Sequence, residues 1–335
     1  MTHPSPLAGS PGHAIPLHGR GLFCPQQGTA VREPESDAPG HWVGAPAIYY
    51  DQAGGEFYLT YRRRRARGAV SDRGYAGYIA KSADGIHFED IWSVKKEELG
   101  SPSMERFCLR RSGERWLLYI SYVDPADNRW RIDVLSAESP DAFSADDRQP
   151  VLTAASTGTE GVKDPYVMRI GPAWLMYASY AAAGFDPGQR AAAHATADIY
   201  NTGITTFPSG LATSLDGVSY DWHGEVFGVG EGWDRYQSRI SSILRVEGGW
   251  LGLYDGSADV SGNYEERCGL ALSVNLANWL RLTPQAPALT SPGATGSLRY
   301  VDPVTVGGTT YFYYEYARED GSHELRVYLD AGESQ

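Results

Sequence analysis

Five segments of this chain share one local pattern: a turn residue or a charge, then an aromatic residue, then alternating bulky side chains. The segments are residues 55–64, 114–123, 172–181, 248–257 and 308–317. The aromatic residue that marks the pattern is, in order, Phe57, Trp116, Trp174, Trp250 and Tyr311. Successive markers lie 59, 58, 76 and 61 residues apart. Such a repeat predicts a fold built from similar supersecondary units.

Each repeated segment is preceded by one short predicted strand and followed by another. The tail of the unit carries a Ser and then Asp-Gly or Asn-Leu before an aromatic residue, which is typical of a hairpin turn into an outer fourth strand. We therefore expect an all-β fold, a five-bladed β-propeller of four-stranded antiparallel blades. A pair of β-sandwiches is the alternative all-β interpretation, but it accounts less well for the regular repeat.

Domain organisation follows from the same pattern. Residues 1–20 are rich in Pro, Gly and His, which predicts a flexible N-terminal arm. Residues 21–335 are predicted to form a single propeller domain. The spacing of 76 residues contains an insertion, residues 181–210, and a long loop of this kind is often a functional lid.

Composition excludes several classes of partner. The net charge of −12 argues against nucleic acid, which requires a basic surface. No stretch approaches the roughly 20 apolar residues of a membrane helix, and the N-terminus lacks the pattern of a signal peptide. The three cysteines, Cys24, Cys108 and Cys268, are far apart, which favours reduced thiols and a cytoplasmic location. No metal-ligand spacing or cofactor motif is present, so neither a metal nor a cofactor is expected.

Carboxylates recur at the starts of the predicted inner strands. Proline is tolerated at the first residue of an edge strand, so an Asp-Pro pair there can hold a carboxylate at the mouth of the central channel. Glu105, Asp164 and Asp302 are expected at equivalent places in three blades and hence around one hole. Arg62, Asp255 and Glu315 lie at second-strand ends on the same face. The alternative for each carboxylate is a structural role in capping a turn.

This arrangement resembles the five-bladed β-propeller glycoside hydrolases of families 43, 62, 32, 68 and 117, and the family 130 mannoside phosphorylases. The resemblance covers residues from about 40 to 330. It implies a carbohydrate substrate. In family 43 the catalytic base lies on the first blade, whereas here that position contains Ala45 and Pro46. The roles of that family therefore do not transfer directly.

The resulting hypothesis is a glycosidase that removes a terminal sugar from a small glycan or glycoside, with inversion. Such chemistry needs one carboxylic acid and one carboxylate. Asp302 is the first choice for the base and Glu105 for the acid, with Asp164 either orienting them or acting as the acid. Two alternatives stay open. One is a phosphorylase that resembles family 130, in which the basic residues Arg106, Lys163, Arg239 and Arg299 hold phosphate. The other is a non-catalytic carbohydrate-binding propeller.

Further side chains are candidates for substrate binding. They are Trp42, Arg62, Arg106, His194, Trp233, Arg239 and Asp255. The arginines can instead neutralise the channel carboxylates, the tryptophans can belong to the core, and the histidine can lie on the surface. The run from Arg62 to Arg65 is interpreted mainly as a solvated edge, with alternate side chains on opposite sides of the strand.

Overall fold

The computed structural model describes residues 22–69 and 72–332, and nearly all of its regular structure is β-strand. The predicted arm, residues 1–20, lies outside the described residues. Three of the sheets are separate and four-stranded, and a fourth sheet has eight strands. The eight-stranded sheet divides into two four-stranded units, which meet at one parallel residue pair between Trp42 and His323. The predicted propeller of four-stranded blades is therefore confirmed.

Strands follow one another through each blade in chain order. The first blade contains β2 (Trp42–Asp51), β3 (Glu56–Arg65), β4 (Arg73–Ser82) and β5 (Glu89–Lys95). The second contains β6 (Met104–Ser112), β7 (Arg115–Val123), β8 (Trp130–Ala137) and β9 (Gln149–Leu152). The third contains β10 (Val162–Ile170), β11 (Ala173–Tyr180), β12 (Ser209–Ser214) and β13 (Asp221–Phe227). The fourth contains β14 (Gln237–Val246), β15 (Gly249–Ser257), β16 (Arg267–Ser273) and β17 (Leu280–Arg281).

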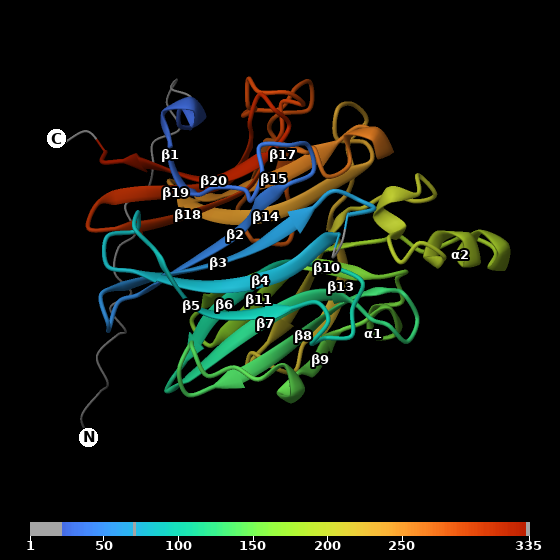
Figure 1. The fold of residues 1–335 in the computed structure, drawn as a ribbon, viewed down its shortest axis with the longest axis horizontal. Helices are drawn as coiled ribbons and strands as arrows, with labels where there is room; N and C mark the ends of the chain where they lie inside the picture. Colours follow the sequence, from blue (N-terminus) through green and yellow to red (C-terminus); the bar gives the residue numbers. More distant parts are fainter. Residues whose placement is uncertain (1–21, 70–71, 333–335) are drawn as a thin grey trace.

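The last blade takes its fourth strand from the other end of the chain. It contains β18 (Leu298–Val306), β19 (Thr309–Ala317) and β20 (His323–Asp330), and β1 (Thr29–Arg32) pairs antiparallel with β20. In Figure 1 the blue β1 accordingly lies beside the red β20. Phe23 adds to this closure because its ring stacks on Phe312 with centroids 4.8 Å apart.

Helices are few and short in the described residues. They are α1 (Ala154–Thr157), α2 (Pro187–His194) and the 3-10 turns η1 (Pro25–Gln27), η2 (Ala145–Asp147), η3 (Ile199–Asn201) and η4 (Val260–Gly262). The predicted insertion contains α2 and η3, and Figure 1 shows α2 projecting at one edge of the molecule. Asp186 caps α2 by accepting a hydrogen bond from the Gln189 amide, which satisfies an otherwise free N–H at the helix start.

Apolar side chains fill the interfaces between neighbouring blades. Trp174 and Met176 of the third blade share one core cluster with Leu117 and Tyr119 of the second. Alternation along each strand sends successive side chains to opposite faces, so every blade contributes to the interface on both of its sides. The repeated aromatic pattern therefore predicts blade packing because burial of these large side chains is a main source of stability.

A β-bulge interrupts the inner strand of every blade at the same depth. The register shifts fall between Gly44 and Ala47, Met104 and Phe107, Lys163 and Tyr166, Ile240 and Ser242, and Arg299 and Asp302. Ala45, Asp164 and Tyr300 lie in three of these bulges with φ of 52°, 59° and 54°. Non-glycine residues rarely adopt this conformation, so the bulges are strained points that the surrounding packing maintains.

The predicted hairpin tails form a repeated side-chain turn. Ser214 Oγ accepts hydrogen bonds from the amides of Asp216 and Gly217, at 3.2 and 2.9 Å. Asp216 Oδ1 accepts from the next two amides, both at 2.8 Å. Ser82 with Asp84, and Ser273 with Asn275, repeat the arrangement. Short polar side chains thus replace backbone partners in the turn.

We predict that Ser214→Ala lowers the free energy of unfolding by about 1–3 kcal/mol, because the buried Gly217 amide loses its acceptor. Urea denaturation measures this change. Thr213→Val is the control, since the Thr213 hydroxyl contacts only the exposed His223 ring and should contribute less than about 0.5 kcal/mol. Equal losses in the two variants would contradict the role given to the turn.

Candidate functional site

Buried ion pairs fill the end of the channel at which the bulges lie. We call this set the polar cluster. Its cationic members are Arg62, Arg64, Lys163, Arg239 and Arg299, and its carboxylates are Glu105, Asp164, Asp255, Glu266 and Glu315. All ten residues are buried. They come from all the blades, so the predicted convergence of distant acids occurs for Glu105 and Asp164.

Glu105 lies in the bulge of β6 and is held by two arginines of the first blade. Its Oε2 accepts from Arg62 Nε at 2.8 Å, and its Oε1 accepts from Arg64 Nη1 at 3.1 Å. Burial alone would raise the pKa of this carboxyl, but the charges of Arg62, Lys163 and Arg64 hold the pKa of Glu105 well below its ordinary value. Glu105 is therefore an ionised carboxylate at neutral pH.

Asp164 lies in the equivalent bulge of β10 and is the meeting point of several donors. Its Oδ2 accepts from Arg239 Nη1 at 2.6 Å and from the Tyr300 hydroxyl at 3.3 Å. Its Oδ1 accepts from the Arg106 amide at 3.2 Å. The Lys163 Nζ atom lies 3.6 Å from Oδ2. The charge of Lys163 also lowers the pKa of Glu105, so Lys163 lies near both carboxylates.

The pKa of Asp255 is shifted in the opposite direction from that of Glu105. Its Oδ2 accepts from Arg239 Nη2 at 2.8 Å, and its Oδ1 accepts from the Tyr300 amide at 2.9 Å. Burial raises the pKa of Asp255 to about 6, in spite of the neighbouring Arg239. The cluster therefore contains one carboxyl whose pKa lies well below its ordinary value and another whose pKa is raised.

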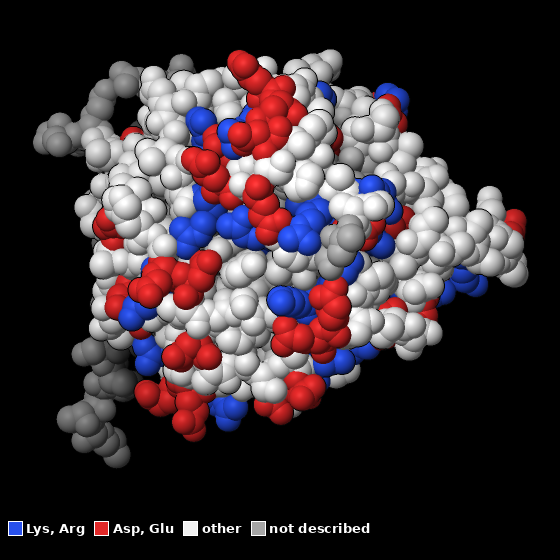
Figure 2. All heavy atoms as spheres, in the orientation of Figure 1, with Lys and Arg blue, Asp and Glu red and all other residues white. Residues whose placement is uncertain are grey.

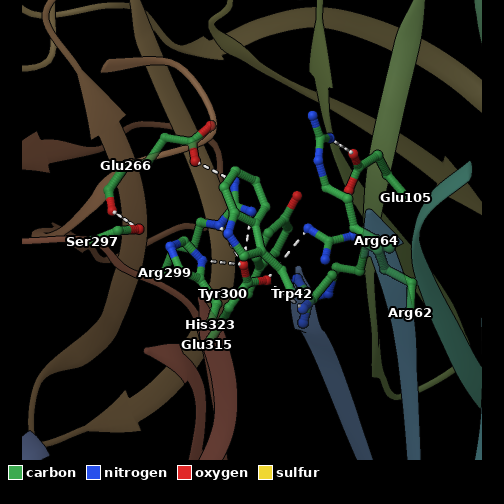
Figure 3. A network of polar contacts seen from close by, with 12 residues as sticks. Trp42, Arg62, Arg64, Glu105, Glu266, Ser297, Arg299, Tyr300, Glu315 and His323 are labelled. Carbon is green, nitrogen blue, oxygen red and sulfur yellow. Dashed lines mark hydrogen bonds and ion pairs between the residues drawn. The ribbon is translucent and has the colours of Figure 1, made fainter. Parts of the chain in front are cut away.

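The candidate list from the sequence missed Glu266, named Glu315 only as a strand end, and considered Arg299 only as a phosphate-binding residue in the phosphorylase alternative. Arg299 donates from Nη1 to Glu266 Oε2 at 2.6 Å and from Nη2 to Glu315 Oε1 at 2.8 Å (Figure 3). Glu315 Oε2 accepts from the Ala45 amide at 2.9 Å. Its place at the end of the second strand was a usable signal. Glu266 lies in a loop before β16, where no strand pattern marks it.

Asp302 does not occupy the place expected for it. The β-bulge lies before Asp302, so Tyr300 is the residue equivalent to Asp164, and the assumed equivalence of the two Asp-Pro pairs is wrong. Asp302 accepts from Arg106 Nη2 at 2.9 Å and from the Ile48 amide at 3.0 Å. Burial raises its pKa. Among the described residues, Arg106 links Asp302 to Asp164.

The predicted binding residues divide into two groups. Arg62, Arg239 and Asp255 belong to the polar cluster, Arg106 links Asp164 to Asp302, and Trp42 forms part of its wall. The Trp42 ring stacks on His323 at 4.3 Å and lies 4.9 Å from the Arg64 guanidinium carbon. The interpretation of Arg62–Arg65 as a solvated edge is wrong for Arg62 and Arg64, which are buried because alternation points both at Glu105.

Trp233 and His194 lie outside the polar cluster. Trp233 stacks on Tyr254 with ring centroids 5.6 Å apart, and its indole N–H donates to the Thr283 carbonyl at 2.8 Å. His194 Nε2 lies 3.0 Å from Glu160 Oε2, which Arg129 also contacts. The histidine therefore anchors the insertion to the blades through Glu160, which is not a member of the polar cluster.

The insertion contacts the cluster through η3 and the residues before it. The Tyr200 ring centroid lies 4.1 Å from Lys163 Nζ. Asp198 is paired with Arg67 and accepts from the Tyr264 hydroxyl. Trp130 and Tyr264 complete an aromatic cage around Lys163, at 5.0 and 5.1 Å. The cage stabilises a buried ammonium group by cation–π attraction.

Charges of both signs are interspersed on the molecular face that Figure 2 shows. Within the described residues, no group of three or more His, Cys, Asp or Glu side chains is arranged to hold a metal ion. No helix in the described ranges is long and apolar enough to cross a membrane.

Comparisons with known proteins show the fold. A solved structure described as a glycoside hydrolase aligns with a TM-score of 0.65 at 14% identity, over 91% of this chain and 90% of that one. A GH43_1 enzyme from Xanthomonas citri aligns with a TM-score of 0.60 at 12% identity, over 90% of each chain. A β-1,2-mannobiose phosphorylase from Listeria innocua aligns with a TM-score of 0.56 at 14% identity, over 87% and 89%. No protein-family model and no curated protein sequence matches the chain.

We predict that Glu105→Gln lowers the free energy of unfolding by about 3–5 kcal/mol, because it leaves Arg64 buried without its charged partner and leaves Arg62 with only the longer contact to Glu315. Chemical denaturation measures the loss. Glu56→Gln is the control, since its ion pair with Lys81 is largely exposed and should contribute less than about 1 kcal/mol. A loss below 1 kcal/mol for Glu105→Gln would contradict the assignment.

Acid should destabilise the protein through the same carboxylates. The folded-state pKa values of Glu105, Glu266 and Glu315 lie below the ordinary 4.5, because cluster cations outweigh burial, and that of Glu266 is about 2. The unfolded chain therefore binds protons first as the pH falls, and stability is lost from about pH 4.5 towards pH 2. Asp255, with its raised pKa, acts in the opposite direction between about pH 4 and 6.

Urea unfolding at stepped pH measures this dependence. Glu266→Gln should show a shallower loss of stability between pH 4.5 and pH 2 than the parent protein, because one of the linked groups is gone. Identical slopes in the two proteins would show that Glu266 is not coupled to folding.

Proposed function

We propose that this protein is a glycosidase that cleaves a terminal sugar from a small glycan or glycoside. The observation that carries the proposal is that Glu105 and Asp164, from different blades, flank Lys163 and Tyr300 in one buried cluster. Glycoside hydrolysis requires two carboxyl groups with different proton affinities near one bond. The fold is shared with glycoside hydrolases and with a glycoside phosphorylase, which supports the same class of substrate.

The electrostatics favour a different assignment of roles from the one that the sequence suggested. Glu105, whose pKa is lowered, is the better general base, because it is ionised and can activate a water molecule. Asp164 and Asp255 share Arg239, and the raised pKa of Asp255 favours this residue as the source of the proton that a general acid supplies. Attack by water activated at Glu105 and protonation from the opposite side would invert the anomeric carbon.

Asp302 becomes a positioning residue in this scheme. It holds the Arg106 side chain, and the Arg106 amide donates to Asp164. The negative charge of Asp302 would thus act on catalysis through the placement of Asp164 and without touching the sugar.

Substrate entry requires the insertion to move. The carboxylates Glu105 and Asp164 are 0% exposed, and Tyr200 lies against Lys163 beside them. Two surface hollows, of about 460 and 480 Å³, are lined by residues of the first two blades that do not belong to the polar cluster. The segment from Ala181 to Pro208 is therefore proposed as a lid that opens for the sugar and then excludes water.

A non-catalytic carbohydrate-binding propeller is the second candidate. Ala45 favours it, because this residue occupies the bulge of the first blade, where the related family 43 enzymes are expected to carry the base. Location in the cytoplasm stays a prediction.

We predict that the protein hydrolyses at least one member of a panel of nitrophenyl furanosides and pyranosides, and that Asp164→Asn lowers kcat by about 10²–10⁴-fold. Release of nitrophenol measures the rate, and NMR of the first product gives the anomer. Asp133→Asn is the matched control, because Asp133 is equally buried and bonded to Tyr122 and Arg131 but lies outside the cluster.

Thermal unfolding identifies variants that fold, and Asp255→Asn replaces Asp164→Asn if the latter does not. Turnover that depends on added phosphate would reassign the reaction to phosphorolysis. Saturable binding of a sugar with no turnover by the parent protein would favour the non-catalytic candidate.

A further inference from the structure

Two cationic groups of the polar cluster have hydrogen-bond capacity that the described residues leave unused. Lys163 Nζ and Arg62 Nη1 are fully buried nitrogen atoms without a hydrogen-bond acceptor. The Lys163 Nζ atom lies 3.6 Å from Asp164 Oδ2, which is too long for a hydrogen bond. A buried cation with unused donors is costly, and the cost is reduced when an acceptor enters.

Both groups lie beside Glu105. Arg62 donates to Glu105 from Nε, and the charge of Lys163 contributes to the low pKa of that carboxyl. Ser179 is the residue opposite Lys163 in the strand register, and the Tyr200 ring contacts the ammonium group. Both cationic groups therefore lie next to the proposed catalytic base.

The number and kind of the donors indicate the chemistry of the missing partner. An ammonium group offers three N–H donors, and Arg62 Nη1 offers two more. A neutral hydroxyl accepts at only two lone pairs, whereas a carboxylate accepts at about four sites and matches the planar guanidinium.

Charge balance favours a monoanion. The cluster already contains five cations and five carboxylates, so one added carboxylate brings one extra negative charge and a phosphate dianion brings two. Asp255, whose pKa is raised by burial, can take up one proton in compensation.

We propose that Lys163 and Arg62 form a subsite for a carboxylate carried by the sugar, so that the cluster selects glycosides of the uronic acid class. The inference rests on the proposed function and narrows its substrate. Lys163 supplies charge and several donors, and Arg62 donates from Nη1 while its Nε and Nη2 keep their bonds to Glu105 and Glu315.

Calorimetric titration of the full chain tests the subsite. The ligands are both anomers of methyl glucuronide and methyl galacturonide, the matched neutral glucosides and galactosides, and inorganic phosphate. At least one uronide should bind about tenfold or more tightly than its neutral counterpart, since a hydrogen bond to a charged group contributes about 1.5–3 kcal/mol. Lys163→Met should remove that preference, while Lys81→Met, at a surface lysine, should keep it.

Lys163→Met keeps a long side chain in the aromatic cage and removes a buried ammonium group that has no hydrogen-bond acceptor. The thermal midpoint of the variant should therefore not fall. Should this variant fail to fold, Arg62→Lys serves as the second test, because it keeps the positive charge and loses the guanidinium group with its Nη1 donor. It should also reduce the preference for the uronide.

Each outcome of these experiments either supports or overturns the proposed subsite. Binding of neutral sugars as tight as uronides, or no binding by any uronide, overturns the subsite. Binding of phosphate alone that Lys163→Met abolishes assigns these donors to inorganic phosphate and also overturns it. Uronide binding that depends on Lys163, without turnover of any glycoside, supports the subsite and rejects the glycosidase. Turnover of neutral glycosides only rejects the subsite and leaves the glycosidase standing.

Discussion

Buried ion pairs across blade boundaries are the constraint on which the rest of this structure depends. Arg62 of the first blade contacts Glu105 of the second and Glu315 of the last, so one side chain joins three blades. Arg299 and Glu266 join the last two in the same way. Desolvation makes each pair a weak source of net stability, but the loss of one partner leaves a buried charge. The pairs therefore penalise other arrangements of the blades more than they stabilise this one.

Sequence patterns predicted the blades because each repeat carries its own burial pattern. The aromatic markers and the Ser-x-Asp-Gly turns are local features, so the fold class, the strand order and the convergence of Glu105 with Asp164 could be inferred from them. Asp302 was misplaced because a single-residue bulge shifts the register after Arg299, and no composition signal reveals which residue is the extra one. Glu266 was missed because it reaches the cluster from a loop.

The pKa values of Glu105 and Asp255 are shifted in opposite directions because the two carboxyl groups have different numbers of neighbouring cations. Glu105 contacts Arg64 and Arg62, the latter shared with Glu315, and Lys163 lies nearby; the sum of these charges exceeds the cost of burial. Asp255 shares Arg239 with Asp164 and also feels the charge of Glu266, so burial prevails. The same residue types therefore yield two carboxyl groups of one cluster whose pKa values are shifted in opposite directions, which is the condition that the proposed acid–base chemistry requires.

The proposed lid contributes charged and aromatic side chains to the surroundings of the polar cluster. Asp198 of the insertion pairs with Arg67 and lies 3.9 Å from Arg73, so closure brings one more carboxylate to the first blade. In the proposed closed state the Tyr200 ring contacts Lys163. This contact would exclude water from an ammonium group that has no hydrogen-bond acceptor among the described residues. Exclusion of water strengthens every charge interaction beneath the lid. An anionic sugar would supply the acceptor that water provides in the open state, and the closed lid would then be most stable with its ligand bound.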